Sequence, residues 1–109
     1  NVFSPTHRDG YVQPAPRRGR LGLCADDATL GCNDKVLGIY DYTGRGLNSD
    51  GSLPPIPSPV KGIDDDSHGT AMAAHAVGSR VDGTGFQGAV SFSGAAPRAA
   101  LLSYKVCVA

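Results

Sequence analysis

The sequence predicts an α/β fold in which parallel strands are joined by a crossover helix. Two short apolar runs, at residues 35–41 and 99–109, have the length and the side chains of strands in a buried sheet. Between them lies an alanine-rich segment that begins near His68 and ends at Gly78, with residues that favour a helix. The order strand, helix, strand is typical of parallel strands with a crossover connection.

The remaining segments are predicted to be irregular. Residues 1–34 are rich in proline, arginine and glycine and show no period of 2 or 3.6, so we expect an extended N-terminal arm with turns. Residues 35–109 would form the domain that follows the arm. Within it, prolines and glycines predict a loop at 42–62, and the glycine-rich stretch 79–94 is expected to hold at most one short strand, near 89–92.

Length and charge exclude several classes of protein. A chain of 109 residues is long enough for one domain, and its 10 basic residues equal its 10 acidic ones. The basic residues form no stripe, so nucleic acid is not an expected partner. No apolar run approaches the roughly 20 residues of a membrane span, so no membrane partner is expected either. The chain begins without Met and without a signal-type apolar core, and we expect a processed piece of a longer precursor.

The chain has three cysteines. Cys24 and Cys32 flank a short polar segment and would form a local disulfide in an oxidising compartment, or remain free thiols otherwise. Two cysteines are too few for a zinc site, which needs about four ligands. Cys107 lies in an apolar run, where a buried, unreactive thiol is expected.

Two residues stand where an α/β sheet commonly places reactive groups. Asp41 ends the first predicted strand and His68 begins the predicted helix, so both would lie at the carboxyl edge of the sheet. A carboxylate bonded to one imidazole nitrogen would fix the tautomer and leave the other nitrogen to exchange protons near neutral pH. By composition alone, a helix-cap histidine beside a solvated aspartate is the competing interpretation.

Longer motifs favour the reactive pair. The stretch "HGTAMAAHAVG" closely resembles the histidine motif of the subtilisin-like serine proteases, in which His-Gly-Thr precedes a helix of small residues that ends in glycine. Further on, "SGAAPRAALLSYKVC" resembles that family's Gly-x-Ala-Pro-x-Ala turn and the strand after it. The ending "YKVC" and the preceding "GTGFQGAVSFSGAAP" are most similar to the plant cucumisin-type branch. The resemblance covers residues 35–109.

The resemblance implies part of a subtilisin-like fold and a serine endopeptidase with an Asp-His-Ser triad. His68 would be the general base and Asp41 the carboxylate that orients it. Family members act on protein or peptide substrates and are secreted, and no cofactor is needed. Some of them bind calcium, so the resemblance allows a calcium ion.

The chain departs from the family pattern in three places. Tyr42 separates Asp41 from the Thr-Gly that usually follows the aspartate, and an alignment on Thr-Gly would place Tyr42 at the catalytic position. Ala71 replaces the second histidine of His-Gly-Thr-His. No Gly-Thr-Ser-Met-Ala motif is present, and Ser91 and Ser93 lie in no nucleophile context. These residues therefore match the N-terminal part of a catalytic domain and would need the remainder of that domain as a partner.

Two further groups allow metal binding as well as a purely local role. The acidic run 64–66 lacks the spaced oxygen ligands of a calcium loop, and acidic residues before a helix are favoured by its dipole. The family also has aspartates before its histidine, matched by Asp64 and Asp66, which suggests that they order the loop. His75 follows His68 by two helical turns, so the two could share a helix face and, with the aspartates, hold a metal ion. The His-Glu-x-x-His spacing is absent, so a small metal-binding domain is the least favoured alternative. The main alternative to the protease is a non-catalytic protein built on a protease segment.

Overall fold

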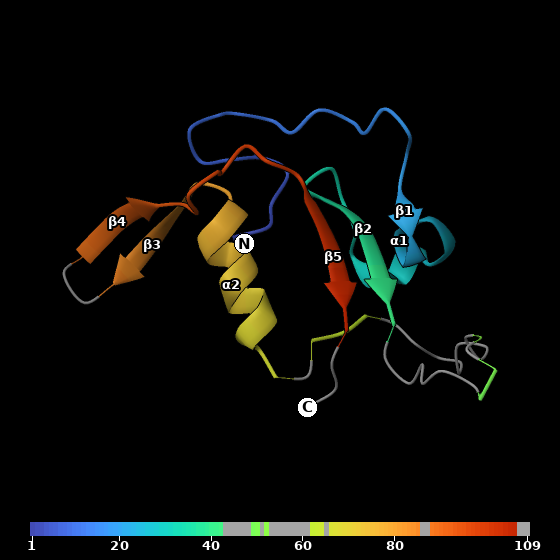
Figure 1. Ribbon diagram of the computed structural model, residues 1–109. Coiled ribbons are helices and arrows are strands. Elements are labelled where there is room, and N and C mark those ends of the chain that lie inside the picture. The colour runs from blue at the N-terminus through green and yellow to red at the C-terminus, as the bar shows by residue number, and fades with distance from the viewer. Residues whose placement is uncertain (43–48, 51, 53–61, 65, 86–87, 107–109) are drawn as a thin grey trace.

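The computed structural model describes residues 1–42, 49, 50, 52, 62–64, 66–85 and 88–106. They form one three-stranded sheet in the order β1-β2-β5 and one two-stranded sheet of β3 and β4 (Figure 1). In chain order, the elements are β1 (Leu21–Gly22), α1 (Leu23–Asp26), a 3-10 helix (Ala28–Leu30), β2 (Val36–Asp41), α2 (His68–Val77), β3 (Val81–Gly85), β4 (Gly88–Phe92) and β5 (Leu101–Lys105).

The three-stranded sheet is parallel throughout, with β2 in its centre. Helix α2 lies in the connection between β2 and β5, which confirms the predicted α/β fold with parallel strands and a crossover helix. The arrangement is consistent with part of a subtilisin-like fold. No helix among the described residues has both the length and the apolar character needed to span a bilayer.

The three elements predicted most directly are present with small changes at their ends. The strands predicted at 35–41 and 99–109 occupy Val36–Asp41 and Leu101–Lys105, and the helix ends one residue before Gly78. Burial on both faces was expected for the first strand, but only Gly38 and Asp41 of β2 are buried. The predicted thiol Cys107 and most of the predicted loop 42–62 lie outside the described residues.

One face of the three-stranded sheet is partly exposed among the described residues. On one face, Tyr40 and Tyr104 are register partners whose rings stack with centroids 4.9 Å apart. Tyr104 is nevertheless 53% exposed and its neighbour on that face, Leu102, is 42% exposed. The described residues therefore leave this face without the cover that a parallel sheet normally has on both sides.

The N-terminal arm is more ordered than its composition indicates. Residues 21–30 supply β1, α1 and the 3-10 helix, and β1 pairs with Gly38 and Ile39 of β2. Cys24 and Cys32 form a disulfide across this part, with their Cα atoms 5.8 Å apart. Two-residue strands and one-turn helices carry too few residues to produce a period in the sequence.

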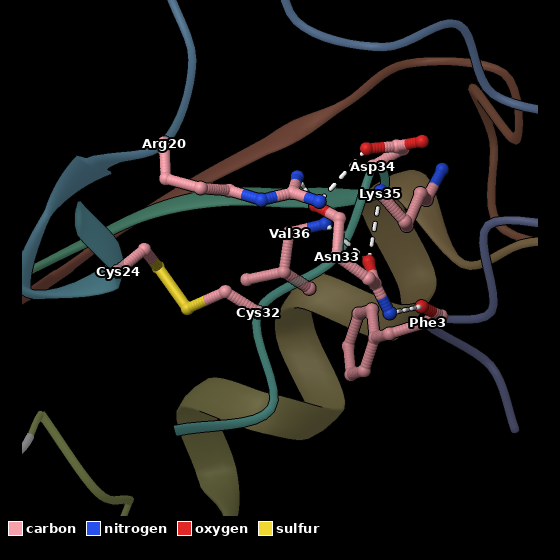
Figure 2. Close-up of polar contacts among 8 residues, drawn as sticks. All are labelled: Phe3, Arg20, Cys24, Cys32, Asn33, Asp34, Lys35 and Val36. Atoms are coloured by element: carbon pink, nitrogen blue, oxygen red, sulfur yellow. Dashed lines mark hydrogen bonds and ion pairs between the residues drawn. A yellow bond between two sulfur atoms is a disulfide. The ribbon is translucent and has the colours of Figure 1, made fainter. Parts of the chain in front are cut away.

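Asn33 joins the arm to the start of β2 (Figure 2). Its side-chain oxygen accepts hydrogen bonds from the backbone N–H groups of Lys35 and Val36 at 2.8 and 2.9 Å, and its amide nitrogen donates to the carbonyl of Phe3 at 3.1 Å. Beside it, the Arg20 guanidinium donates to Asp34 at 2.8 Å. Residues 1–34 and the start of β2 thus share one network of polar contacts.

The glycine-rich stretch contains a hairpin instead of a single strand. The strand predicted near 89–92 is β4, and it pairs antiparallel with β3, which the sequence did not predict. Glycines lower the strand propensity of this stretch. At Gly83, however, the absence of a side chain makes room for the Phe92 ring, since a Cβ there would lie 2.6 Å from it.

Candidate active site

Asp41 is the last residue of β2, and only 7% of its surface is exposed. Its Oδ2 atom accepts a hydrogen bond from the backbone N–H of Gly62 at 2.9 Å. Burial and this hydrogen bond hold the carboxylate at the carboxyl edge of the sheet, as the sequence predicts.

Gly62 can approach Asp41 only because it is a glycine. Its φ is +64°, a region that residues with a Cβ rarely adopt. In addition, a Cβ at this position would lie 2.3 Å from Cγ2 of Ile39. Both conformation and space therefore require glycine where the chain crosses the end of β2.

Asp64 links this crossing to the start of α2. Its Oδ1 atom accepts hydrogen bonds from the N–H groups of Asp66 and Ser67 at 3.0 and 2.8 Å. Its Oδ2 atom accepts from the N–H of Thr70 at 2.9 Å and from the Thr70 hydroxyl at 2.5 Å. The carboxylate thus satisfies N–H groups that a helix start leaves without partners, which supports the capping role over a metal-binding role.

The same contacts favour the charged form of Asp64. The hydrogen bond from the Thr70 hydroxyl is the largest cause that holds the pKa of Asp64 well below its usual range, and the backbone N–H groups add to it. Ser67, at the N-cap, has a φ of 73° and makes no side-chain capping bond. Asp64 is therefore the side chain that caps α2.

His68 is the first residue of α2 and is exposed. Figure 1 shows that α2 starts at the same edge of the sheet at which β2 and β5 end. The two predicted site residues thus lie at one edge of the molecule, Asp41 in the sheet and His68 at the helix start. The segment 62–64, bonded to Asp41 at one end and to α2 at the other, connects them.

His75 is exposed near the end of α2, where its backbone carbonyl accepts a hydrogen bond from the N–H of Ala95. Within the described part of the chain, no group of three or more His, Cys, Asp or Glu side chains is arranged to hold a metal ion. The alternatives of a metal pair with His68 and of a calcium site at 64–66 therefore gain no support from these residues, among which Asp65 is not included.

Tyr42 faces the opposite side of the sheet from Asp41. Its ring is parallel to that of Tyr104, with centroids 6.4 Å apart, and its N–H donates to the carbonyl of Lys105. Successive residues of a strand point to opposite faces, so only one of the two adjacent residues can face the segment 62–64. Asp41, and not Tyr42, is the residue that contacts this segment, through the N–H of Gly62.

Lys105 was not expected to belong to this site. It ends β5, directly opposite Asp41 in the parallel register, and its ammonium group donates a hydrogen bond to the carbonyl of Ile63. The available signal was a charged residue within the mostly apolar run 99–109, but its pairing with Asp41 depends on the sheet register.

Neither of the two serines set aside on sequence grounds is activated by a histidine among the described contacts. The Ser91 hydroxyl accepts a hydrogen bond from Arg80 at 3.2 Å, and the Ser93 hydroxyl donates to the carbonyl of Gly94 at 3.0 Å. Ser93 therefore uses its proton in a local turn.

Comparison with known proteins identifies relatives for almost the whole chain. Over 95% of its length it is 30% identical to the subtilisin-like protease SBT4.12 of Arabidopsis thaliana, and 34% identical to SBT3.17 and SBT5.3 of the same plant. The chain spans only 12%, 15% and 14% of these three relatives. A match over 95% of the chain also takes in most of residues 1–34, which the motifs did not cover. No protein-family model matches the chain, and no solved structure matches it significantly.

Proposed function

Because the chain belongs to the subtilisin-like protease family, we propose that it supplies two of the three catalytic residues of a serine endopeptidase. Asp41 is the orienting carboxylate, His68 is the general base, and the nucleophilic serine comes from residues outside these 109. The observation that carries the proposal is the placement of a buried carboxylate and an exposed histidine at one edge of the sheet, joined by the hydrogen-bonded segment 62–64.

In this mechanism, His68 removes the proton of the serine hydroxyl as the hydroxyl attacks a peptide carbonyl. The resulting imidazolium then gives that proton to the leaving amine. Asp41 remains ionised, holds the imidazole in the productive tautomer and stabilises its charged form. The substrates are proteins or peptides, and no cofactor takes part.

A fluorophosphonate probe, which reacts with activated serines, tests the proposal. The 109-residue chain alone should stay unlabelled, whereas a polypeptide that carries these residues together with the serine should be labelled. The change His68→Ala should abolish labelling of that polypeptide, and His75→Ala serves as the matched control on the same helix. Undiminished labelling of the His68 variant would show that another group is the base.

We further propose that the protein is secreted. The disulfide between Cys24 and Cys32 supports an oxidising compartment, because such bonds are rare in the cytosol. Recovery of the protein from the medium of cells that express it, with Cys24 and Cys32 resistant to thiol reagents, would test the location.

A non-catalytic protein built on a protease segment is the second candidate. Tyr42 favours it, because it stands directly after Asp41 where the family pattern has a small residue. The two candidates differ in one result: a serine-containing polypeptide with these residues that neither reacts with the probe nor cleaves casein would be non-catalytic.

A further inference from the structure

Asp41 and Lys105 hold backbone groups of two neighbouring residues, the N–H of Gly62 and the carbonyl of Ile63. They are register partners on β2 and β5, so their side chains lie on the same face of the sheet. Asp41 accepts the N–H of Gly62, and Lys105 donates to the carbonyl of Ile63. The negative Asp41 thus binds a backbone donor and the positive Lys105 binds a backbone acceptor. The two backbone groups belong to consecutive residues.

The residue after Ile63 is Asp64, whose carboxylate caps the first turn of α2. A displacement of Ile63 is therefore transmitted through one residue to the helix start that carries His68. Ile63 itself is 63% exposed, so its side chain contributes little to holding the segment. The segment is held at this point by the hydrogen bonds from its backbone to Asp41 and Lys105.

We propose that Lys105 is a positioning residue, which sets the location of His68 relative to Asp41 by holding the carbonyl of Ile63. This inference rests on the proposed function, in which the two residues act as a pair. A displacement of about 1 Å between catalytic groups can lower the rate by a factor on the order of 100. Loss of the Lys105 contact should therefore lower kcat and leave KM nearly unchanged.

The test compares Lys105→Met, which removes the donor, with Lys105→Arg, which keeps a cationic donor. Tyr104→Phe is the matched control, because it changes the preceding residue on the other face of the sheet. In the serine-containing polypeptide we expect kcat to fall about 10- to 100-fold for Lys105→Met. We expect substantial recovery for Lys105→Arg and little change for Tyr104→Phe. Equal activity of the Met and Arg variants would overturn the proposal.

Two measurements on the 109-residue chain separate this proposal from the proposed function. In Lys105→Met, the Gly62 amide should exchange with solvent faster, and the imidazole resonances of His68 should no longer respond to Asp41→Asn. If they respond as fully as in the unchanged chain, Lys105 does not position the pair. With Lys105 retained, Asp41→Asn should alter both the His68 resonances and the activity of the serine-containing polypeptide. If it alters neither, the proposed pairing of Asp41 and His68 fails. The exchange rate of the Gly62 amide shows separately whether Lys105 holds the segment. An equal rate in Lys105→Met and in the unchanged chain would contradict the proposal.

Discussion

The carboxylate of Asp41 accepts a hydrogen bond from the backbone N–H of Gly62, 21 residues further along the chain, at 2.9 Å. This contact places Gly62 beside the end of β2. It places Asp64, only two residues later, where it can cap α2. The helix start that carries His68 is therefore linked to the end of β2 through a glycine, to which the proposed mechanism gives no chemical role.

Gly62→Ala should lower the free energy of unfolding by about 1–3 kcal/mol, because the new Cβ meets both an unfavourable φ and the Ile39 side chain. Gly19→Ala is the matched control, since Gly19 has a φ of +71° with nothing within 4 Å of its added Cβ. It should cost about 1 kcal/mol, for the backbone conformation alone. Urea denaturation gives both values, and equal losses would show that the approach to Ile39 is not tight.

The contribution of Asp64 to stability should depend on pH in the acid range. Its pKa is lowered in the folded protein, so its hydrogen bonds stabilise the fold fully above the unfolded value of about 4. This stabilisation is lost as the pH falls through 4 towards the lowered folded value. The stability difference between the unchanged chain and Asp64→Asn should therefore be larger at about pH 6 than at about pH 3, as measured by urea denaturation.

Asp66→Asn is the control for that series. The Asp66 carboxylate accepts none of the hydrogen bonds recorded among the described residues, although its backbone N–H donates to Asp64. A similar pH-dependent difference for this variant would mean that general acidity before the helix, and not the Asp64 cap, is responsible.

The sequence predicts those helices and strands whose own residues have a recognisable composition. The apolar run at β2 and the alanine-rich run at α2 identify those elements because each is long enough to show its composition and its end. By contrast, β1 has two residues and is held by pairing with β2, and β3 contains two of the glycines that predict irregular structure. Their pairing comes from tertiary contacts, which no local pattern contains.

The residues of the candidate site also include some that local sequence predicts and some that depend on tertiary contacts. The positions of Asp41 at a strand end and of His68 at a helix start were predictable, because both ends are visible in the sequence. Lys105 and Gly62 were not, because one depends on the register of β5 against β2 and the other on a single positive φ. Tyr42 was an open alternative to Asp41 in the sequence. In the structure, Tyr42 stacks on Tyr104 on one face of the sheet, whereas Asp41 bonds to Gly62 on the other.

The disulfide between Cys24 and Cys32 should stabilise the part of the chain that carries β1 and α1. It closes a loop with a sequence separation of 8. Chain entropy then gives about 2–3 kcal/mol of stabilisation. The double change Cys24→Ser and Cys32→Ser should lower the free energy of unfolding by that amount. A reducing agent should have the same effect on the unchanged chain and none on the variant; an effect on both would point to a different cause.

Limited trypsin digestion should cut first in the arm among the described basic residues. Arg17 and Arg18 are exposed, and their segment forms no helix or strand. A protease needs an accessible, extended backbone. Arg20 offers a poorer site, because its guanidinium is held by Asp34 and by the carbonyl of Asn33. Lys35 is fully buried. Cleavage after Arg17 or Arg18 should therefore precede cleavage after Arg20 or Lys35, as mass spectrometry of timed samples would show.

The fragment released by this cut should stay attached to the remainder. Buried His7 accepts the N–H of Arg80 and bonds to Gln13, and the N–H of Ser79 donates to the carbonyl of Val2 at 2.8 Å. Residues 1–13 are thus bound to the segment after α2 by contacts that cleavage leaves intact. Gel filtration under native conditions should show both pieces in one peak, and the change of Arg17 and Arg18 to Gln should remove the early cut. Early separation of the pieces would mean that the covalent link, and not the His7 contacts, keeps the arm in place.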